Sequence, residues 1–457
     1  MRDLLVTLIV FGSLPFIIRR PAIGILMWSW IGYMNPHRLS WGFAYSMPFA
    51  QIVAIATLIA LPFSKDKLRM PWNALTVLWL LFVVWICITT ALAIDPSLSK
   101  LSLEKALKIQ LFAWLTVMLM QNEQRVRWLV WVIVLSLGFY GLKGGVWAYV
   151  TGAENRVWGP PGSFIEDNNA LAMALLMVAP LMIFLVMRTA DKRIKAGLIV
   201  LLVFTGLAIL SSHSRGALLG MAAMLSFLLL KSRRKLATGF AIVLVVPVLL
   251  SFMPQSWFQR METISNYQAD YSALGRITAW EFAADLASKR ITGGGFDCFV
   301  EANYRRFAPD ISAEVDKRDG RFQDAHSIYF KVVGEQGFPG LILYLAIAFL
   351  SYRSGTWVRK RASKVPNMLW AGDLATMLQV SLIGFFVAGA FLGLPYFDLY
   401  FHLVALLVIL KAMVQRELAA ATQPATAAMP AGAGPSAAIE TPAPTRSGSL
   451  IRQPRTR

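Results

Sequence analysis

The chain has 457 residues, of which 57% are hydrophobic and 15% charged, and its mean hydropathy is +0.57. This balance excludes an ordinary soluble domain and indicates a protein that resides in lipid. Lys and Arg number 44 against 25 Asp and Glu, a net charge of +19, but the basic residues gather in short loops between apolar segments, which favours membrane topology over a nucleic-acid partner.

Thirteen stretches are apolar enough to be candidate membrane-spanning helices. In chain order they cover residues 4–18, 22–34, 49–63, 72–93, 103–120, 128–150, 170–187, 196–210, 216–230, 236–252, 338–352, 374–394 and 397–413. The sequence therefore predicts an all-α polytopic membrane protein with about twelve transmembrane helices. Because the first two stretches are short, both twelve and thirteen spans are possible. No small-residue cleavage site follows the N-terminus, so we expect the first helix to be retained.

The connections between these stretches alternate in charge. Short loops rich in Lys and Arg stay on the cytoplasmic side. Such loops cover residues 65–69, 125–127, 188–195, 231–235 and 353–364. The other connections are therefore expected outside: residues 95–102, 151–169 and 211–215, the turn near Pro395, and one large periplasmic loop over residues 254–337. Long loops cross the membrane regardless of their charge, so the many charges of the large loop do not oppose this topology.

Four regions follow from this pattern. They are the N-terminal transmembrane helices (1–253), the large periplasmic loop (254–337), the C-terminal transmembrane helices (338–416) and a tail (417–457). Within the loop, the pattern predicts short helices over residues 276–288, with Ile277, Trp280, Ala284 and Leu286 near one face, and over residues 298–307. The tail is rich in Ala, Pro, Thr and Ser, so we expect it to be disordered and cytoplasmic.

Two basic residues stand near the outer ends of predicted helices, where an ionisable group is costly and is a candidate functional residue. Arg215 follows a Ser-Ser-His-Ser turn, and Lys143 stands beside Gly144 and Gly145, which allow a phosphate or another helix to approach closely. A long basic side chain that snorkels to the membrane interface explains both residues equally well.

The large loop supplies two further candidates. Arg276 stands near the start of a predicted short helix, where a guanidinium and exposed N–H groups suit a phosphate or diphosphate. His326, one of four histidines, precedes a membrane helix and lies near Asp324, and an imidazole that titrates near neutrality suits a base for a hydroxyl. The alternatives are a solvated surface arginine and a helix-capping or interfacial histidine.

Several common catalytic signatures are absent from the sequence. It contains no HExxH, no DxD-type metal pair in an outer loop, no Walker loop and no GxSxG. Its two cysteines, Cys87 and Cys298, support neither a disulfide framework nor a thiolate metal cluster. We therefore expect a site without metal or cofactor, built from arginines and one histidine.

The candidate residues lie in motifs that follow one another in a recognisable order. These are Gly-Pro-Pro-Gly-Ser-Phe at 159–164, Asp-Asn-Asn at 167–169, Ser-Arg-Gly-Ala-Leu-Leu at 214–219, Gly-Arg at 275–276 followed by Trp280, Ala-His-Ser at 325–327, and Gly-Glu-Gln-Gly at 334–337. Over residues 143–340 this order resembles the O-antigen ligase and polymerase superfamily, which commonly has Asn where this chain has Ser327. Residues 20–48 further resemble the probable O-glycosylation ligases associated with exosortase systems.

The resemblance implies a GT-C-like glycosyltransferase of the bacterial inner membrane whose active site faces the periplasm. As an O-antigen ligase it would transfer a glycan from undecaprenyl diphosphate to a sugar hydroxyl of lipid A-core, in lipopolysaccharide synthesis, by metal-independent inverting transfer. By motif, His326 would be the base, Arg215 and Arg276 would hold the diphosphate, and Lys143 and Asn169 would add substrate contacts. An O-antigen polymerase or a protein O-glycosylation ligase fits the same motifs. A transporter is the non-enzyme alternative, but the sequence lacks the internal repeat expected of one.

Overall fold

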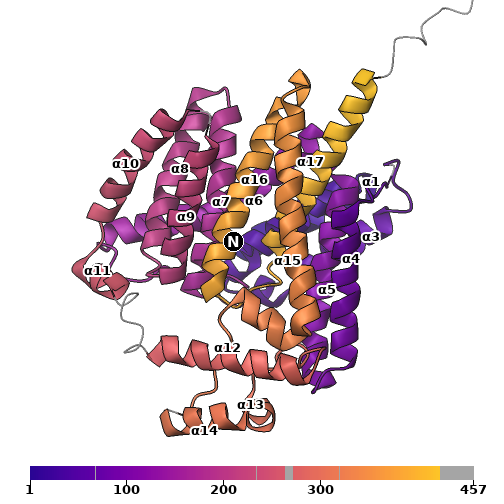
Figure 1. Cartoon of the computed structure of the whole chain (residues 1–457). Coiled ribbons are helices and arrows are strands. Elements are labelled where there is room, and N and C mark those ends of the chain that lie inside the picture. The colour runs from indigo at the N-terminus through magenta and orange to yellow at the C-terminus, as the bar shows by residue number, and fades with distance from the viewer. Residues whose placement is uncertain (67, 233, 263–270, 319, 423–457) are drawn as a thin grey trace, which may run out of the picture.

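A computed structural model describes residues 1–66, 68–232, 234–262, 271–318 and 320–422 (Figure 1). The described residues form α-helices and short 3-10 helices, and none of them forms a strand. The prediction of an all-α protein is therefore confirmed.

The helices follow the predicted apolar stretches. In chain order they are α1 (Arg2–Arg19), α2 (Pro21–Met34), η1 (Pro36–Leu39), η2 (Phe43–Ser46), α3 (Phe49–Ala60), α4 (Ala74–Ala91), α5 (Pro96–Leu119), α6 (Glu123–Val150), α7 (Asn168–Arg188), α8 (Lys192–Leu210), α9 (Arg215–Lys231), α10 (Lys235–Ser251), α11 (Gln255–Glu262), α12 (Tyr271–Lys289), α13 (Glu301–Phe307), α14 (Pro309–Arg318), α15 (Ile328–Ala362), η4 (Pro366–Met368), α16 (Leu369–Ala388), η5 (Gly389–Phe391) and α17 (Asp398–Thr422). Each of the thirteen predicted stretches overlaps one helix among α1–α10 and α15–α17.

Not all of these helices are long and apolar enough to cross a membrane by themselves. Among the described residues, six segments meet that standard by length and composition: α4, α6, α7, α8, α15 and the segment Pro366–Phe391 that contains α16. The pair α10 and α11, bent by 111°, makes a seventh if it is one broken span. Twelve or thirteen spans therefore stay a prediction.

Helix α7 lies at the centre of one half of the bundle. It is apolar on all sides and nearly every residue between Ala170 and Leu185 is buried, as expected of a helix surrounded by others. Its neighbours are α6, α8, α9 and α16. In Figure 1, α7–α10 lie on one side of the molecule and α3, α4 and α5 on the other, with α15, α16 and α17 between them.

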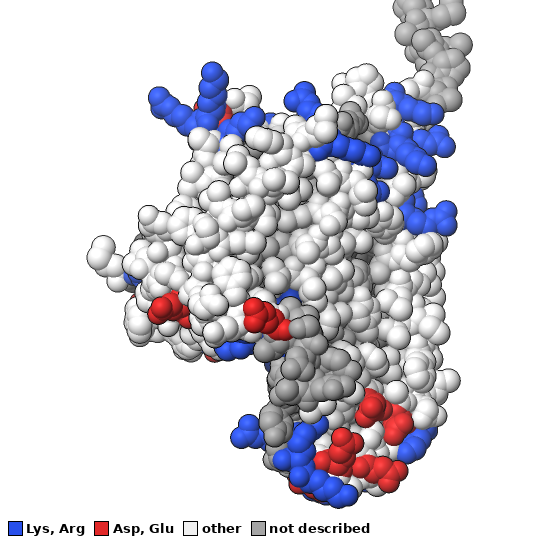
Figure 2. Space-filling view, turned by 60° about the vertical axis from the view of Figure 1, so that its left-hand side comes forward, with Lys and Arg blue, Asp and Glu red and all other residues white. Residues whose placement is uncertain are grey.

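The two ends of the bundle differ in charge. Connections predicted to be cytoplasmic contact each other: Arg125 pairs with Asp66 at 2.9 Å, between the α3–α4 loop and the start of α6. Connections predicted to be outside also meet, since Val157 N donates to Ser211 O at 3.4 Å. Figure 2 shows Lys and Arg gathered along the upper end of the bundle, charges of both signs at the lower end, and a largely uncharged flank. This distribution fits a bundle that crosses lipid.

Short helices of the large loop cover the lower end of the bundle, where α12 runs crosswise with α13 and α14 below it (Figure 1). The predicted helices over 276–288 and 298–307 correspond to α12 and α13, whereas α11 and α14 were not predicted. Of the face predicted for α12, Leu286 is buried and Ile277, Trp280 and Ala284 are half-buried. Burial extends beyond this face, to Gly275, Thr278, Ala279, Phe282, Ala283 and Ala287. The reason is that α12 packs on α15 from one side and on α13 and α14 from another.

Helix α15 begins at Ile328 rather than at the expected Phe338, and it is broken at Gly337. The break frees the carbonyls of the preceding turn, because Pro339 has no N–H to donate to Glu335 O. Gly294 N and Gly295 N from the loop donate instead to Gly334 O at 2.8 Å and to Glu335 O at 3.0 Å. The loop after α12 is thereby fixed to the first turns of α15.

The last helix, α17, also extends further than expected, to Thr422 instead of ending near Arg416. The remainder of the predicted tail, residues 423–457, lies outside the described residues.

Candidate functional site

Arg215 occupies the first turn of α9, at the end of the bundle where the large loop lies. Ser214 caps this helix by accepting from Ala217 N at 3.3 Å. The preceding turn is held by Asn168, whose amide donates to Ser212 O at 2.7 Å. The N-termini of α7 and α9 therefore lie side by side, and the N–H groups and helix dipoles at these ends make this a favourable place for an anion.

A turn between α16 and α17 brings Arg215 towards His326. A Cβ built on Gly216 would lie 3.1 Å from Phe391 Cβ, and one built on Gly393 would lie 2.9 Å from Asp324 Oδ2 and 3.5 Å from His326 Cα. A side chain at either glycine would crowd these neighbours. The turn over residues 389–393 is thus packed between the start of α9 and the segment that carries the histidine.

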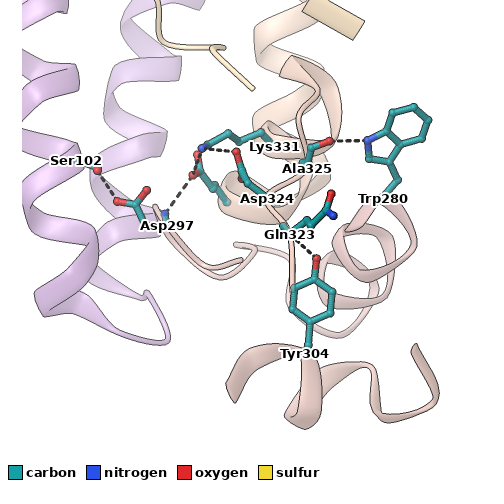
Figure 3. Close-up of polar contacts among 9 residues, drawn as sticks. Ser102, Trp280, Asp297, Tyr304, Gln323, Asp324, Ala325 and Lys331 are labelled. Atoms are coloured by element: carbon teal, nitrogen blue, oxygen red, sulfur yellow. Dashed lines mark hydrogen bonds and ion pairs between the residues drawn. The ribbon is translucent and has the colours of Figure 1, made fainter. Parts of the chain in front are cut away.

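Arg276 approaches the same segment from α12. The next residue towards the N-terminus, Gly275, lies so close to Gln323 that a Cβ there would be 2.5 Å from the Gln323 amide carbon. One turn further, Trp280 Nε1 donates to Ala325 O at 2.7 Å (Figure 3). The Trp280 ring stacks on Phe330 at 4.8 Å between centroids. These contacts place the first turns of α12 beside residues 323–326.

His326 lies just before α15, with a positive φ of 43° and its side chain exposed at one edge. The surrounding protein displaces water from the imidazole and lowers the pKa of His326, with Asp324 and Asp167 opposing and Arg276 and Lys331 adding to the effect. The lowered pKa favours the neutral imidazole, whose unprotonated ring nitrogen has a lone pair for a proton. It interacts electrostatically with charged groups from α12 and α15 and from the start of α7, so these elements converge on it.

Asp324 affects His326 by its charge. Its Oδ2 accepts from Lys331 Nζ at 3.0 Å, and no hydrogen bond joins Asp324 to the imidazole among the described residues. Lys331 Nζ also lies 3.9 Å from Glu335 Oε1, one turn further along α15. Lys331 therefore lies between two carboxylates, that of Asp324 near the histidine and that of Glu335 in the protein interior.

Glu335 anchors this group of charges to the rest of the protein. Its side chain is 1% exposed, and Oε1 accepts from Asp297 N at 3.1 Å. The Asp297 carboxylate in turn accepts from the Ser102 hydroxyl of α5, as Figure 3 shows. A chain of contacts thus runs from α5 through the loop after α12 and the first turns of α15 to Asp324.

With this geometry in place, the comparison with known families is informative. Residues 199–345 match the O-antigen ligase family. The match includes Arg215, Arg276 and His326, and it supports a membrane enzyme of the O-antigen ligase and polymerase superfamily that acts on lipid-linked glycans. Residues 1–190 match a family of unknown function, and no curated protein matches the chain. The resemblance of residues 20–48 to exosortase-associated ligases stays a prediction.

The other two predicted substrate-binding residues, Asn169 and Lys143, lie in different places. Asn169 is in the first turn of α7, where its amide donates to the capping carboxylate of Asp167 at 3.1 Å, within the group around His326. Lys143 lines a separate cavity of about 520 Å³ together with Arg156, Trp147 and Trp158. Neither Arg215, Arg276 nor His326 lines that cavity.

His213, the other histidine near the site, is engaged in structure. It adopts a φ of 56°, its Nε2 lies 3.0 Å from Ala153 O, and its own carbonyl accepts from Arg260 Nε at 3.0 Å. Burial lowers the pKa of His213. Its ring contact with the 151–169 loop fits the alternative of a helix-end residue better than a catalytic one.

The sequence offered little indication of Lys331, Asp297 and Ser102. Glu335 belongs to the Gly-Glu-Gln-Gly motif at 334–337, but the motif alone indicates no role for its side chain. Lys331 is one of many basic residues in the sequence. The available signal was the spacing of four residues between Lys331 and Glu335, since residues four apart face each other on a helix. It was missed because the helix was expected to start only at Phe338. No group of three or more His, Cys, Asp or Glu among the described residues is arranged to hold a metal ion.

Proposed function

We propose that the protein is an O-antigen ligase, a GT-C-like glycosyltransferase of the bacterial inner membrane that works on the periplasmic side. It would transfer a glycan from undecaprenyl diphosphate to a sugar hydroxyl of lipid A-core. The observation that carries the proposal is that the family match spans Arg215, Arg276 and His326, which lie on separate elements brought to one end of the bundle. Membrane lipids surround the bundle, and the donor enters from them.

In the proposed reaction the two arginines bind the donor diphosphate. A guanidinium makes two parallel charge-assisted hydrogen bonds to phosphate oxygens, which a lysine does not reproduce. Arg215 contributes its guanidinium at the N-terminus of α9, which itself favours an anion, and Arg276 contributes a second guanidinium from α12. Charge that develops on the departing diphosphate is stabilised by groups that are already in position. Asn169, at the start of α7, would contribute an amide, whereas Lys143 lines a separate cavity and would contact a part of the substrate away from the diphosphate.

His326 acts as the general base. Its neutral imidazole takes the proton of the acceptor hydroxyl while that oxygen attacks the anomeric carbon from the face opposite the diphosphate. The new glycosidic C–O bond forms as the bond to the diphosphate oxygen breaks, so the configuration inverts. Undecaprenyl diphosphate leaves with the bonding electrons, and no metal is needed in this scheme.

The test is genetic and biochemical. Deletion of the gene should remove long O-chains from lipopolysaccharide on a gel while lipid-linked glycan accumulates. Purified protein given undecaprenyl-diphosphate-linked glycan and lipid A-core in detergent should form the ligated product. Lipopolysaccharide that keeps core plus one repeat after deletion would instead indicate a polymerase, and unchanged lipopolysaccharide with loss of a glycosylated protein would indicate a protein O-glycosylation ligase.

A further inference from the structure

Three ionisable side chains form a compact group directly behind His326. Lys331 is the central member, with Asp324 at 3.0 Å on the side of the histidine and Glu335 at 3.9 Å on the buried side. The exposed fractions of the three side chains fall from 35% for Asp324 to 18% for Lys331 and 1% for Glu335. The group therefore extends from the edge of the site into the protein interior.

A buried carboxylate is costly unless a charge and hydrogen bonds compensate it. Glu335 Oε1 receives the backbone N–H of Asp297, but within the described structure Glu335 Oε2 has no hydrogen-bond partner. Lys331, with its ammonium 3.9 Å from Oε1, is the cation that pairs with Glu335. Apolar residues fill a protein interior at lower cost than a buried ion pair, so this pair is a candidate for a role beyond packing.

Hydrogen bonds from two other segments hold the turn that carries Glu335. Gly294 N and Gly295 N donate to the carbonyls of Gly334 and Glu335, and Trp85 Nε1 of α4 donates to Gln336 O at 2.8 Å. The turn that carries Glu335 is therefore held from two sides, whereas His326 stands before the helix at a surface edge. A rigid turn connected through Lys331 to Asp324 is suited to fix what lies at that edge.

We propose that Lys331 and Glu335 are positioning residues for His326, an inference that rests on the proposed function of this site. Glu335, anchored on Asp297, holds the Lys331 ammonium, and Lys331 holds the Asp324 carboxylate beside the imidazole. In this arrangement Lys331 neutralises part of the Asp324 charge. The two charges beside the imidazole are thereby held in place, and the base stays neutral at working pH. Neither residue touches substrate.

The charges that face His326 set the sign of the expected effect. Asp324 and Asp167 raise its pKa, and Arg276 and Lys331 lower it. Lys331→Met removes a cation and leaves the Asp324 charge uncompensated, and both changes raise the pKa of His326. The neutral fraction of the imidazole then falls on the acid side, so the acid limb of activity moves to higher pH. Lys331→Arg keeps the charge and should leave the limb where it is in the wild type.

A chemical titration tests this without relying on ligation. Diethyl pyrocarbonate acylates only neutral imidazole, so its rate at His326, read by mass spectrometry across a pH series, reports the pKa of that side chain in the full-length protein in detergent. We expect the midpoint to move to higher pH in Lys331→Met and not in Lys331→Arg. Lys317→Met, which removes an exposed lysine from α14, is the matched control and should match the wild type.

A second variant, Lys331→Met/Glu335→Gln, guards against misfolding. Lys331→Met alone leaves Glu335 buried without its partner, whereas the double variant removes both charges together. Gln keeps an oxygen that accepts from Asp297 N, so the fold is conserved. This double variant should show the same upward shift of the His326 midpoint. Midpoints equal to the wild type in both variants would overturn the proposal, whatever the ligation assay shows.

Ligation with undecaprenyl-diphosphate-linked glycan and lipid A-core supplies the second readout. If the wild type ligates, Lys331→Met should lower kcat with little change in KM, by about a hundredfold if the base moves by roughly 1 Å. A uniform loss at every pH with an unmoved acid limb would reduce Lys331 to a structural residue. If neither the wild type nor Lys317→Met ligates, the proposed function fails, and the acylation midpoints still decide whether Lys331 tunes His326.

Discussion

The break in α15 offers a sharp test of how the site is built, through Gly337→Ala. Gly337 has φ 68° and ψ −178°, a conformation nearly restricted to glycine, which costs other residues about 1–3 kcal/mol. A Cβ at this position would also lie 2.0 Å from Ile291 O, a backbone atom that has no rotamer to escape into. Relief of such an overlap typically costs a further 1–3 kcal/mol or so. We therefore expect a loss of unfolding free energy of about 2–6 kcal/mol.

The same substitution should also weaken activity. Displacement of Ile291 would disturb the hydrogen bonds from Gly294 and Gly295 to the turn that carries Glu335. Gly197→Ala is a matched control, because Gly197 lies inside α8 and a Cβ added there would meet no atom within 4 Å, so alanine should stabilise the helix by about 0.5–1 kcal/mol. Unfolding of both variants in mixed micelles of dodecyl maltoside and SDS measures the difference. Equal midpoints for the two variants would refute the reasoning about the break.

Three further predictions concern the catalytic residues and the topology. Arg215→Lys and Arg276→Lys should each lower ligation by about a hundredfold to a thousandfold while the protein still inserts, since lysine cannot chelate the diphosphate; full activity of either would return that arginine to a snorkelling role. His326→Ala should lower the rate by about a hundredfold to ten-thousandfold without loss of donor binding, and His213→Ala should do much less. Assays with excess chelator accompany them, and loss of wild-type activity there would contradict the metal-independent mechanism. Cysteines placed at Arg276 and His326 should react with an impermeant reagent in cells with a permeabilised outer membrane, whereas one at Arg361 should not; labelling at Arg361 would reverse the orientation.

The sequence by itself determined the helices and the order of the candidate motifs. Hydropathy locates apolar helices because each must bury a long apolar surface in lipid or in the bundle, and this requirement is local to the segment. The basic loops likewise carry their signal in a few adjacent residues, and the loops expected on one side do meet, as Asp66 and Arg125 illustrate. Arg215, Arg276 and His326 were recognisable because each stands in a short motif.

The tertiary structure alone decided how these residues are held. The first turns of α15 contain Lys331 and Glu335, so hydropathy placed the membrane helix from Phe338 onward. In the structure the helix starts at Ile328, and its Gly334 and Glu335 carbonyls accept hydrogen bonds from Gly294 and Gly295 of the loop after α12. The buried face of α12 depended on which helices pack against it, and no periodicity within the helix specifies that. The proposed role of Lys331 and Glu335 depends on their contacts with Asp324 and Asp297. Such contacts between single residues across the fold leave no repeating pattern in a sequence.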